Sequence, residues 1–304
     1  MLFGATLFLI FAGAEVKSRD AGLSVPDWPL SYGKVWPKMV GDVFYEHGHR
    51  TIATAVGLLT VILAIWTART DSRSWVRSLG WLVLVAVIVQ GVLGGLTVKN
   101  LLPPSISATH ATLAQTFLCL VGWWAYAGTK EWNSPSSADP RVARTAFRAC
   151  VGAVLAIFIQ LLLGAWMRHN EAGLAVPFFP VSETGAWLPP TVDRLVIIHM
   201  LHRGFAVVAA VMVLRAVGSV SKRVPALGPH AALVAALVLI QVMLGALVVW
   251  EKKSPVITSI HVMNGAAVLA FTWLMTLRVW RRLAPGGLAG PAGVSAKTHV
   301  VERV

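Results

Sequence analysis

The chain has 304 residues, of which 56% are hydrophobic and 13% are charged, and its mean hydropathy is +0.70. A soluble chain of this length would carry about twice that share of charged residues, so the composition indicates an integral membrane protein. The net charge of +13 comes from basic residues dispersed among apolar segments, which argues against nucleic-acid binding. The two cysteines, Cys119 and Cys150, lack the spacing of a zinc site or a disulfide framework.

Eight apolar segments are predicted as membrane helices, since a spanning helix needs about 20 mostly apolar residues. The first, Leu2 to Ala14, is short, and it has neither the basic start nor the cleavage site of a signal peptide. The other seven are, in chain order, residues 49–68, 78–98, 105–127, 148–167, 194–217, 231–250 and 256–280. Residues 283–304, rich in Gly, Ala and Pro, are predicted to be a disordered cytoplasmic tail.

Basic residues gather in alternate loops, which predicts how the chain is oriented. By the positive-inside rule these loops are expected in the cytoplasm. They contain Arg69, Arg73, Arg77, Lys130, Arg141, Arg144, Arg148, Arg215, Lys222, Arg223, Arg278, Arg281 and Arg282. The other loops mix basic residues with most of the acids. Residues 46–50, which read Glu-His-Gly-His-Arg, are therefore expected at the outer face of the inner (cytoplasmic) membrane.

The two halves of the chain carry the same motifs in the same order. AGLSVP at 21–26 returns as AGLAVP at 172–177, and His49-Arg50 returns as His202-Arg203. The spacing of twenty residues from Gln90 to His110 returns from Gln241 to His261. Four segments per half, an even number, give both halves the same orientation. The predicted fold class is all-α integral membrane, with eight helices in two tandem parallel four-helix bundles, residues 1–130 and 141–282.

Each half places one histidine near the outer start of its second segment and another near the outer start of its fourth. These are His49 and His110 in the first half, and His202 and His261 in the second. Two neutral imidazoles on facing helices can supply both axial ligands of a haem iron. A lone membrane histidine could instead donate a hydrogen bond between helices, but two matched pairs favour haem ligation.

Other residues near these histidines have two readings each. Arg50 and Arg203 could pair with haem propionates, or their side chains could simply reach the membrane interface. Four glycines could let a flat macrocycle approach the backbone, or could serve close helix packing. They are Gly91, Gly94, Gly95 and Gly245. His47 is left unassigned, while His169, His230 and His299 have no counterpart in the other half and are predicted to be solvated.

Glu46 distinguishes the two halves, because alignment of His49 with His202 places His199 opposite it. Glu46 lies one helical turn from His49, where it could assist proton removal or polarise a water at a bound substrate. Alternatively, it is a carboxylate favoured by the dipole at the start of a helix. The asymmetry suggests one catalytic half and one supporting half.

Three features together closely resemble the haem A synthase family. They are the outer-loop sequence GLSVPDWPL at 22–30, the Glu46-x-x-His49-Arg50 motif and the repeated spacing from Gln to His. The resemblance runs from about Gly13 to Trp280. It implies an oxidoreductase that converts the C8 methyl group of haem O to the formyl group of haem A, for use by terminal oxidases.

The resemblance also implies roles for individual residues and partners. Glu46 matches the catalytic carboxylate, His49 and His110 match the ligands of the substrate haem, and His202 and His261 match the ligands of a haem b. The implied partners are haem O synthase as donor, terminal oxidase assembly as acceptor, membrane lipid and a second copy of the chain as a further candidate. Many bacterial relatives carry a cysteine pair in the first outer loop. This chain does not, so no thiol–disulfide role can apply there.

A different class of function fits the histidines equally well. A di-haem b-type electron carrier without catalysis would need the same two bis-histidine bundles, and Glu46 in one half only is what argues against it. A transporter is a third reading, weakened because no segment has the Gly/Pro break of a discontinuous helix. Finally, Gly13 aligns with Gly164, which puts Met1 opposite Gly152, already inside the fifth segment. The native start is therefore expected upstream of Met1.

Overall fold

The computed structural model describes residues 1–133 and 138–283, and within these ranges every regular element is a helix. Eight of the helices have 17 or more residues. They are α1 (Leu2–Ser18), α2 (Asp42–Thr70), α3 (Ser74–Lys99), α4 (Pro104–Ala127), α6 (Pro140–His169), α7 (Arg194–Arg223), α8 (Gly228–Trp250) and α9 (Pro255–Leu283). A short helix, α5 (Lys130–Asn133), and single 3₁₀ turns at Ala172–Leu174 and Pro225–Leu227 complete the order.

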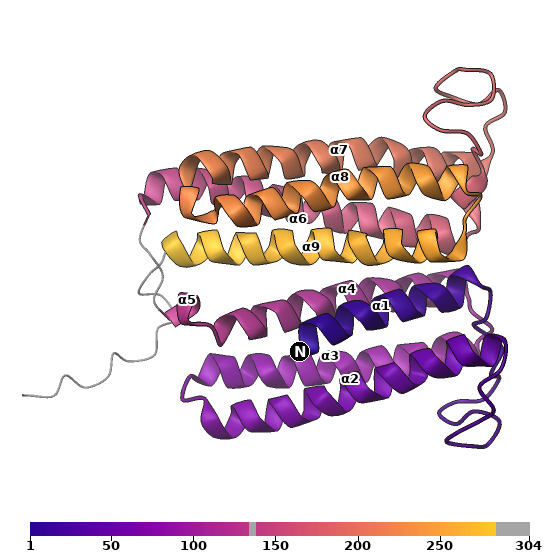
Figure 1. Cartoon of the computed structure of the whole chain (residues 1–304), viewed down its shortest axis with the longest axis horizontal. Coiled ribbons are helices and arrows are strands. Elements are labelled where there is room, and N and C mark those ends of the chain that lie inside the picture. The colour runs from indigo at the N-terminus through magenta and orange to yellow at the C-terminus, as the bar shows by residue number, and fades with distance from the viewer. Residues whose placement is uncertain (134–137, 284–304) are drawn as a thin grey trace, which may run out of the picture.

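The long helices lie side by side in two groups (Figure 1). Helices α1 to α4 pack on one another in the first group, and α6 to α9 in the second. Helix α9 joins the groups, because it packs against α1 and α4 as well as against α6 and α8. The two long loops, residues 19–41 and 170–193, leave the bundle at one end, called here the loop end (Figure 1).

Six of the described helices are long and apolar enough to cross a membrane. They are α2, α3, α6, α7, α8 together with its preceding turn, and α9. Helix α1 has 17 residues, so it is about 25 Å long and falls short of a ~30 Å hydrocarbon core. Helix α4 carries Ser, Thr, His and Gln over its first turns. The prediction of a multi-pass, all-helical membrane protein is thus confirmed, whereas eight membrane spans stay a prediction.

Several helices begin before the apolar segments that predicted them. Helix α2 begins at Asp42 rather than at 49, so Glu46 and His49 lie well inside it. Helix α6 begins at Pro140 rather than at 148, and the Asp139 side chain caps it by accepting a 2.8 Å hydrogen bond from the backbone of Arg141. Hydropathy finds the apolar stretch of a helix and misses its polar first turns. The predicted tail at 283–304 lies outside the described residues, Leu283 excepted.

Close helix packing in the second group depends on small side chains. Ala146, Cys150 and Ala153 on α6 are fully buried, as are Val213 and Ala216 on α7. Small residues let two backbones approach closely, which matters in a membrane because lipid tails compete with apolar side chains for the helix surface. Both cysteines of the chain are free thiols on helices, Cys119 on α4 and Cys150 on α6.

Ionic contacts join the two groups at the loop end. Glu171, which follows α6, accepts hydrogen bonds from Lys17 on α1 and from Lys253 before α9, the latter at 3.1 Å. Partial burial alone would raise the pKa of Glu171, and the hydrogen bonds from the two lysines lower it. Arg168 on α6 donates to the backbone carbonyl of Ala14 at 2.7 Å and to Ser18 Oγ at 2.8 Å. The end of α1 is thereby fixed to the second group.

A second set of contacts joins the groups at the opposite end. Glu131 on α5 forms ion pairs with Arg278 at 2.7 Å and Arg282 at 3.0 Å, both on α9. Arg281 donates to the backbone carbonyl of Trp132 at 2.7 Å. Partial burial on its own would raise the pKa of Glu131, but the hydrogen bonds and charges of the two arginines outweigh it and lower the pKa below 4.5.

We expect Glu131→Gln to destabilise the protein at pH 7 by about 1–2 kcal/mol, because it leaves two arginines with a neutral partner. A depressed folded-state pKa gives stability that is present above the unfolded value and is lost as the pH falls through the folded value. The difference in melting temperature between wild type and variant should therefore shrink below about pH 4.5. Thermal unfolding followed by tryptophan fluorescence measures it, with the exposed Glu183→Gln as control. If the difference in melting temperature between wild type and Glu131→Gln were the same at pH 7 and pH 4, the ion pairs of Glu131 would not be the source of the stability.

Candidate functional site

Four histidine rings lie directly against helix backbone, each at a glycine. A Cβ added to Gly13 would lie 2.9 Å from Cε1 of His49, and one added to Gly164 would lie 3.0 Å from Cε1 of His202. The corresponding distances are 3.1 Å for Gly94 with His110 and 3.3 Å for Gly245 with His261. Real Cβ contacts are essentially never shorter than 3.0 Å and rarely shorter than 3.4 Å. Glycine at these positions is what lets each ring pack where it does.

Each group of helices contains two of these rings. His49 on α2 and His110 on α4 belong to the first group, and His202 on α7 and His261 on α9 belong to the second. Each pair lies within one group of helices, towards the loop end. The structure therefore gives each group of helices its own site.

The polar atoms of these sites suit a haem with two axial imidazoles. The Nδ1 atoms of His49, His110 and His261 are buried without a hydrogen-bond partner. Such atoms are costly unless a ligand or an acceptor satisfies them. Within residues 1–133 and 138–283 no group of three or more His, Cys, Asp or Glu side chains could hold a bare metal ion. Paired imidazoles, each packed on bare backbone, are the donors that a flat, six-coordinate macrocycle needs.

Glu46 is buried at 3% exposure and is fully engaged with the first long loop. Its Oε2 accepts hydrogen bonds from Ser24 Oγ at 3.0 Å and from the backbone of Val25 at 2.8 Å, and its Oε1 pairs with Arg50. His199, the residue that the alignment places opposite Glu46, contacts the carbonyl of Ala172 through Nδ1 at 2.9 Å. Both residues tie helix to loop, but only Glu46 brings a carboxyl group.

Arg50 and Arg203 hold the long loops over the two sites. Arg50 donates to the carbonyls of Val25, Asp27 and Leu30 at 3.0, 2.7 and 3.1 Å. Arg203 donates to the carbonyls of Val176 and Phe178, both at 2.8 Å. The first loop is further ordered at Asp27, whose pKa is lowered by hydrogen bonds from the backbone of Gly33 and Tyr32. The guanidinium groups thus fasten the two long loops to α2 and α7.

The four glycines singled out from the sequence have different neighbours. Gly94 and Gly245 face histidine rings, as described above. At Gly95 an added Cβ would lie 2.7 Å from the ring of Trp28, so the first loop packs there rather than a ligand. Gly91 has nothing within 4 Å of an added Cβ. The contacts of Gly13 and Gly164 with histidine rings were not predicted from the sequence. Their equivalent places in the two halves could have indicated a shared role.

Three further histidines are now placed. The prediction that His230 is solvated is wrong, because it lies in the first turn of α8, where Nε2 is 2.8 Å from the carbonyl of Phe271 and Nδ1 is 2.8 Å from Arg278. His169 is half-buried at the end of α6 rather than in a loop. His47 contacts Ser31 Oγ through Nδ1 at 2.8 Å, which anchors the first loop. His299 lies outside the described residues.

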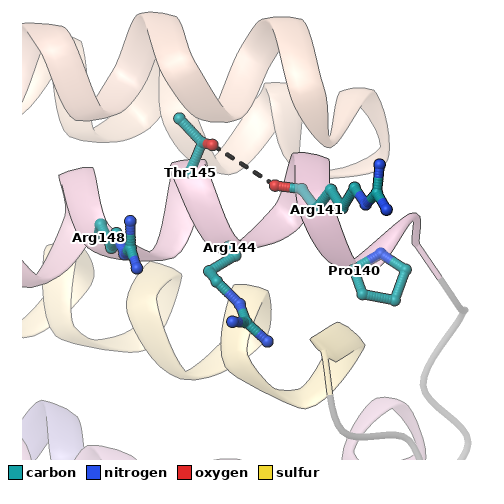
Figure 2. Close-up of a pocket in the computed structure, with 5 residues that line it drawn as sticks. All are labelled: Pro140, Arg141, Arg144, Thr145 and Arg148. Carbon is teal, nitrogen blue, oxygen red and sulfur yellow. Dashed lines mark hydrogen bonds between the residues drawn. The ribbon is translucent and has the colours of Figure 1, made fainter.

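A separate cavity of about 380 Å³ lies at the start of α6, at the end away from the histidines. Figure 2 shows its lining, three arginines with one proline and one threonine. They are Pro140, Arg141, Arg144, Thr145 and Arg148. The cavity has no residue in common with either histidine pair and takes no part in those sites.

The fold and the sites define a multi-pass membrane protein with four half-buried histidines packed on glycines, two in each group of helices. A family model described as "COX15-CtaA: Cytochrome oxidase assembly protein" matches residues 38–273. The chain belongs to this family. The resemblance drawn from the loop sequence and the histidine spacing is thereby confirmed.

Curated relatives agree with the family assignment. A protein named Heme A synthase from Symbiobacterium thermophilum is 30% identical over 215 residues, which cover 69% of this chain and 70% of the relative. A second Heme A synthase, from Sphingopyxis alaskensis, is 28% identical over 91% of this chain and 90% of its own length. A third, from Shouchella clausii, is 26% identical over 68% and 70%. The predictions of an oxidoreductase and of a role in haem A biosynthesis are confirmed at the level of the family.

We expect Gly164→Ala to weaken haem binding in the second group of helices. The added methyl group forces the His202 ring to move by a few tenths of an ångström, and displaced ligand geometry typically costs about 10-fold in affinity. Haem content and the b-type absorption spectrum of the purified protein measure the loss. Gly218→Ala on α7 is the matched control, because an added Cβ there has nothing within 4 Å. Equal haem content in both variants would show that the contact does not matter.

Proposed function

We propose that this protein oxidises the C8 methyl group of haem O to a formyl group, giving haem A. Membership of a family whose curated relatives are named Heme A synthase supports the reaction. The single observation that carries it is Glu46, a buried carboxyl group one turn from His49. A protein that only passes electrons has no use for such a group in one half and not in the other.

In this proposal the two histidine pairs have different tasks. His49 and His110 hold the iron of the substrate haem between α2 and α4, in a first repeat of residues 1–130. His202 and His261 hold a haem b between α7 and α9, in a second repeat of residues 141–282. Haem b, when bound, supplies one-electron transfer. Propionate groups at either mouth compete with the loop carbonyls for Arg50 and Arg203.

The chemistry at the methyl carbon would be two successive two-electron oxidations, each of which takes up one water, releases two protons and passes two electrons to an external acceptor. The first gives an alcohol and the second a hydrated aldehyde. Loss of water from the hydrate leaves the formyl group. Glu46 would take up one of the two protons that each oxidation releases and pass it on to solvent, and Arg50 keeps the carboxyl group in position. The loop held by Arg50 and Glu46 excludes bulk water, which strengthens the electrostatic effect of both groups.

The proposed setting is the inner (cytoplasmic) membrane. There α1 and α4 join the six apolar helices as spans, giving tandem repeats of four with the haem sites towards the outer face. Arginines gather at the end opposite the long loops, as expected for a cytoplasmic side. Haem O synthase is the proposed substrate donor and terminal oxidase assembly the acceptor. Membrane lipid and a second copy of the chain are further proposed partners.

The experiment that tests the function is extraction and chromatography of haems from cells that express the chain together with a source of haem O. We expect a peak of haem A that is absent from cells with the empty vector. Haem O and haem b alone, from well-folded protein with both histidine sites loaded, would contradict the proposal and leave an electron carrier.

We expect Glu46→Gln to keep its haem and lose formyl formation, accumulating haem O or the alcohol. Loss of a general base costs about 10²–10⁴-fold in rate. Ser24→Ala is the matched control, because it removes one hydrogen bond that anchors the loop and leaves the carboxyl group in place. It should change the yield of haem A by only a few fold. Similar losses in both variants would mean that Glu46 acts only as the anchor of the loop.

A further inference from the structure

One helix position recurs beside all four histidine rings. Each glycine that receives a ring has a residue four positions earlier on the same helix, and therefore on the same face. Gln90 precedes Gly94, Gln160 precedes Gly164 and Gln241 precedes Gly245. The residue before Gly13 is Leu9. Three histidines thus meet an amide group and a glycine, whereas His49 meets leucine and glycine.

The three glutamines contact their histidines in similar ways. Nε2 of Gln160 lies 3.1 and 3.3 Å from the two ring nitrogens of His202 and donates to the His202 backbone carbonyl at 3.0 Å. Nε2 of Gln90 lies 3.4 Å from Nε2 of His110 and donates to the His110 carbonyl at 3.0 Å. These contacts hold the ring and, for two of the glutamines, also fix the backbone of the helix that carries it.

The third glutamine has a partner of its own. Nε2 of Gln241 lies 3.3 Å from Nε2 of His261, while its Oε1 accepts a 2.8 Å hydrogen bond from Asn264. By contrast, the Oε1 atoms of Gln90 and Gln160 are buried and unpartnered. As placed, Gln160 faces both the ring and the His202 carbonyl with its donor nitrogen. The glutamine therefore steadies the ring through the hydrogen bond that it donates to the backbone of α7 and through its contact with the ring nitrogens.

His49 has no side-chain amide beside its ring within the described part of the chain, because Leu9 holds the position that glutamine holds beside the other three rings. Its Nδ1 is buried without a hydrogen-bond partner, as are the Nδ1 atoms of His110 and His261. The leucine side chain can neither donate nor accept a hydrogen bond. The ring is therefore held by packing against Gly13 and not by an amide.

We propose that Gln90, Gln160 and Gln241 are positioning residues that make His110, His202 and His261 firm iron ligands, and that Leu9 makes His49 the displaceable one. A partner that fixes the orientation of an imidazole holds it where a metal can bind it. In the second site glutamine lies beside both histidines, which suits a haem b that stays bound. In the first site glutamine lies beside His110 only, which suits a substrate haem that must enter and a product haem that must leave.

This inference rests on the proposed function for the identity of the two haems, but its test does not measure haem A formation. The probe is carbon monoxide, added to the reduced protein with haem b in both sites, since carbon monoxide binds ferrous iron only where an axial ligand gives way. In wild type we expect one of the two haems to react. Gln160→Met keeps the length of the side chain without the amide, and the second haem should then react about 10-fold faster. Leu9→Gln should slow the reaction of the first haem by a similar factor.

Controls separate this effect from damage to the fold. Leu7→Gln puts the same amide on another face of α1 and should keep the wild-type reaction. If Gln160→Met loses its haem, Leu9→Gln decides the question. The inference would be overturned if Leu9→Gln bound carbon monoxide like wild type and the second haem of Gln160→Met stayed unreactive, even if the protein made haem A. If both variants changed carbon monoxide binding as expected but the protein made no haem A, the inference would stand and the proposed function would be refuted.

Discussion

Contact between an imidazole ring and bare helix backbone is the constraint on which both sites depend. It occurs at Gly13, Gly94, Gly164 and Gly245, and each time the ring fills the space that any other side chain would occupy. The two histidines of a pair are carried by different helices, so the contact also fixes how far the ligand-bearing helices lie from their neighbours. Alanine-rich packing between α6 and α7 is compatible with this spacing, because it lets those helices approach closely enough.

The long loops depend on the same helices. Arg50 and Arg203 each lie one residue after a histidine that packs on glycine, so their guanidinium groups emerge at the mouth of a site. There they bind the carbonyls of Val25 and Val176, equivalent residues of the repeated AGLxVP motif. A ring position inside the bundle therefore determines where the loop above it is held. Glu46 adds a second anchor to the first loop, and His199 adds one to the second through the carbonyl of Ala172.

The sequence allowed the histidine pairs, the repeated loop motif and most of the helices to be predicted, because each leaves a periodic or repeated trace. Contacts across helices leave no such trace. The approach of Gln160 to His202 joins residues 42 positions apart, and the placement of His230 against Phe271 depends on how α8 packs on α9. Helix starts such as that of α6, which follows the Asp139 cap, lie in polar sequence where hydropathy gives no signal. The partner of Gly95 was the ring of Trp28, which only the folded loop could bring there.

The two halves show how one scaffold can serve two purposes with few changes. Ring, glycine and loop-binding arginine are the same in both, so the frame of each site is shared. The differences concern which polar groups surround the rings. Glu46 stands where the second half has His199, and Leu9 stands where it has Gln160. The first half thus gains a carboxyl group and loses a side-chain amide beside a ring. Under the proposed function, both changes favour turnover of a substrate over retention of a cofactor.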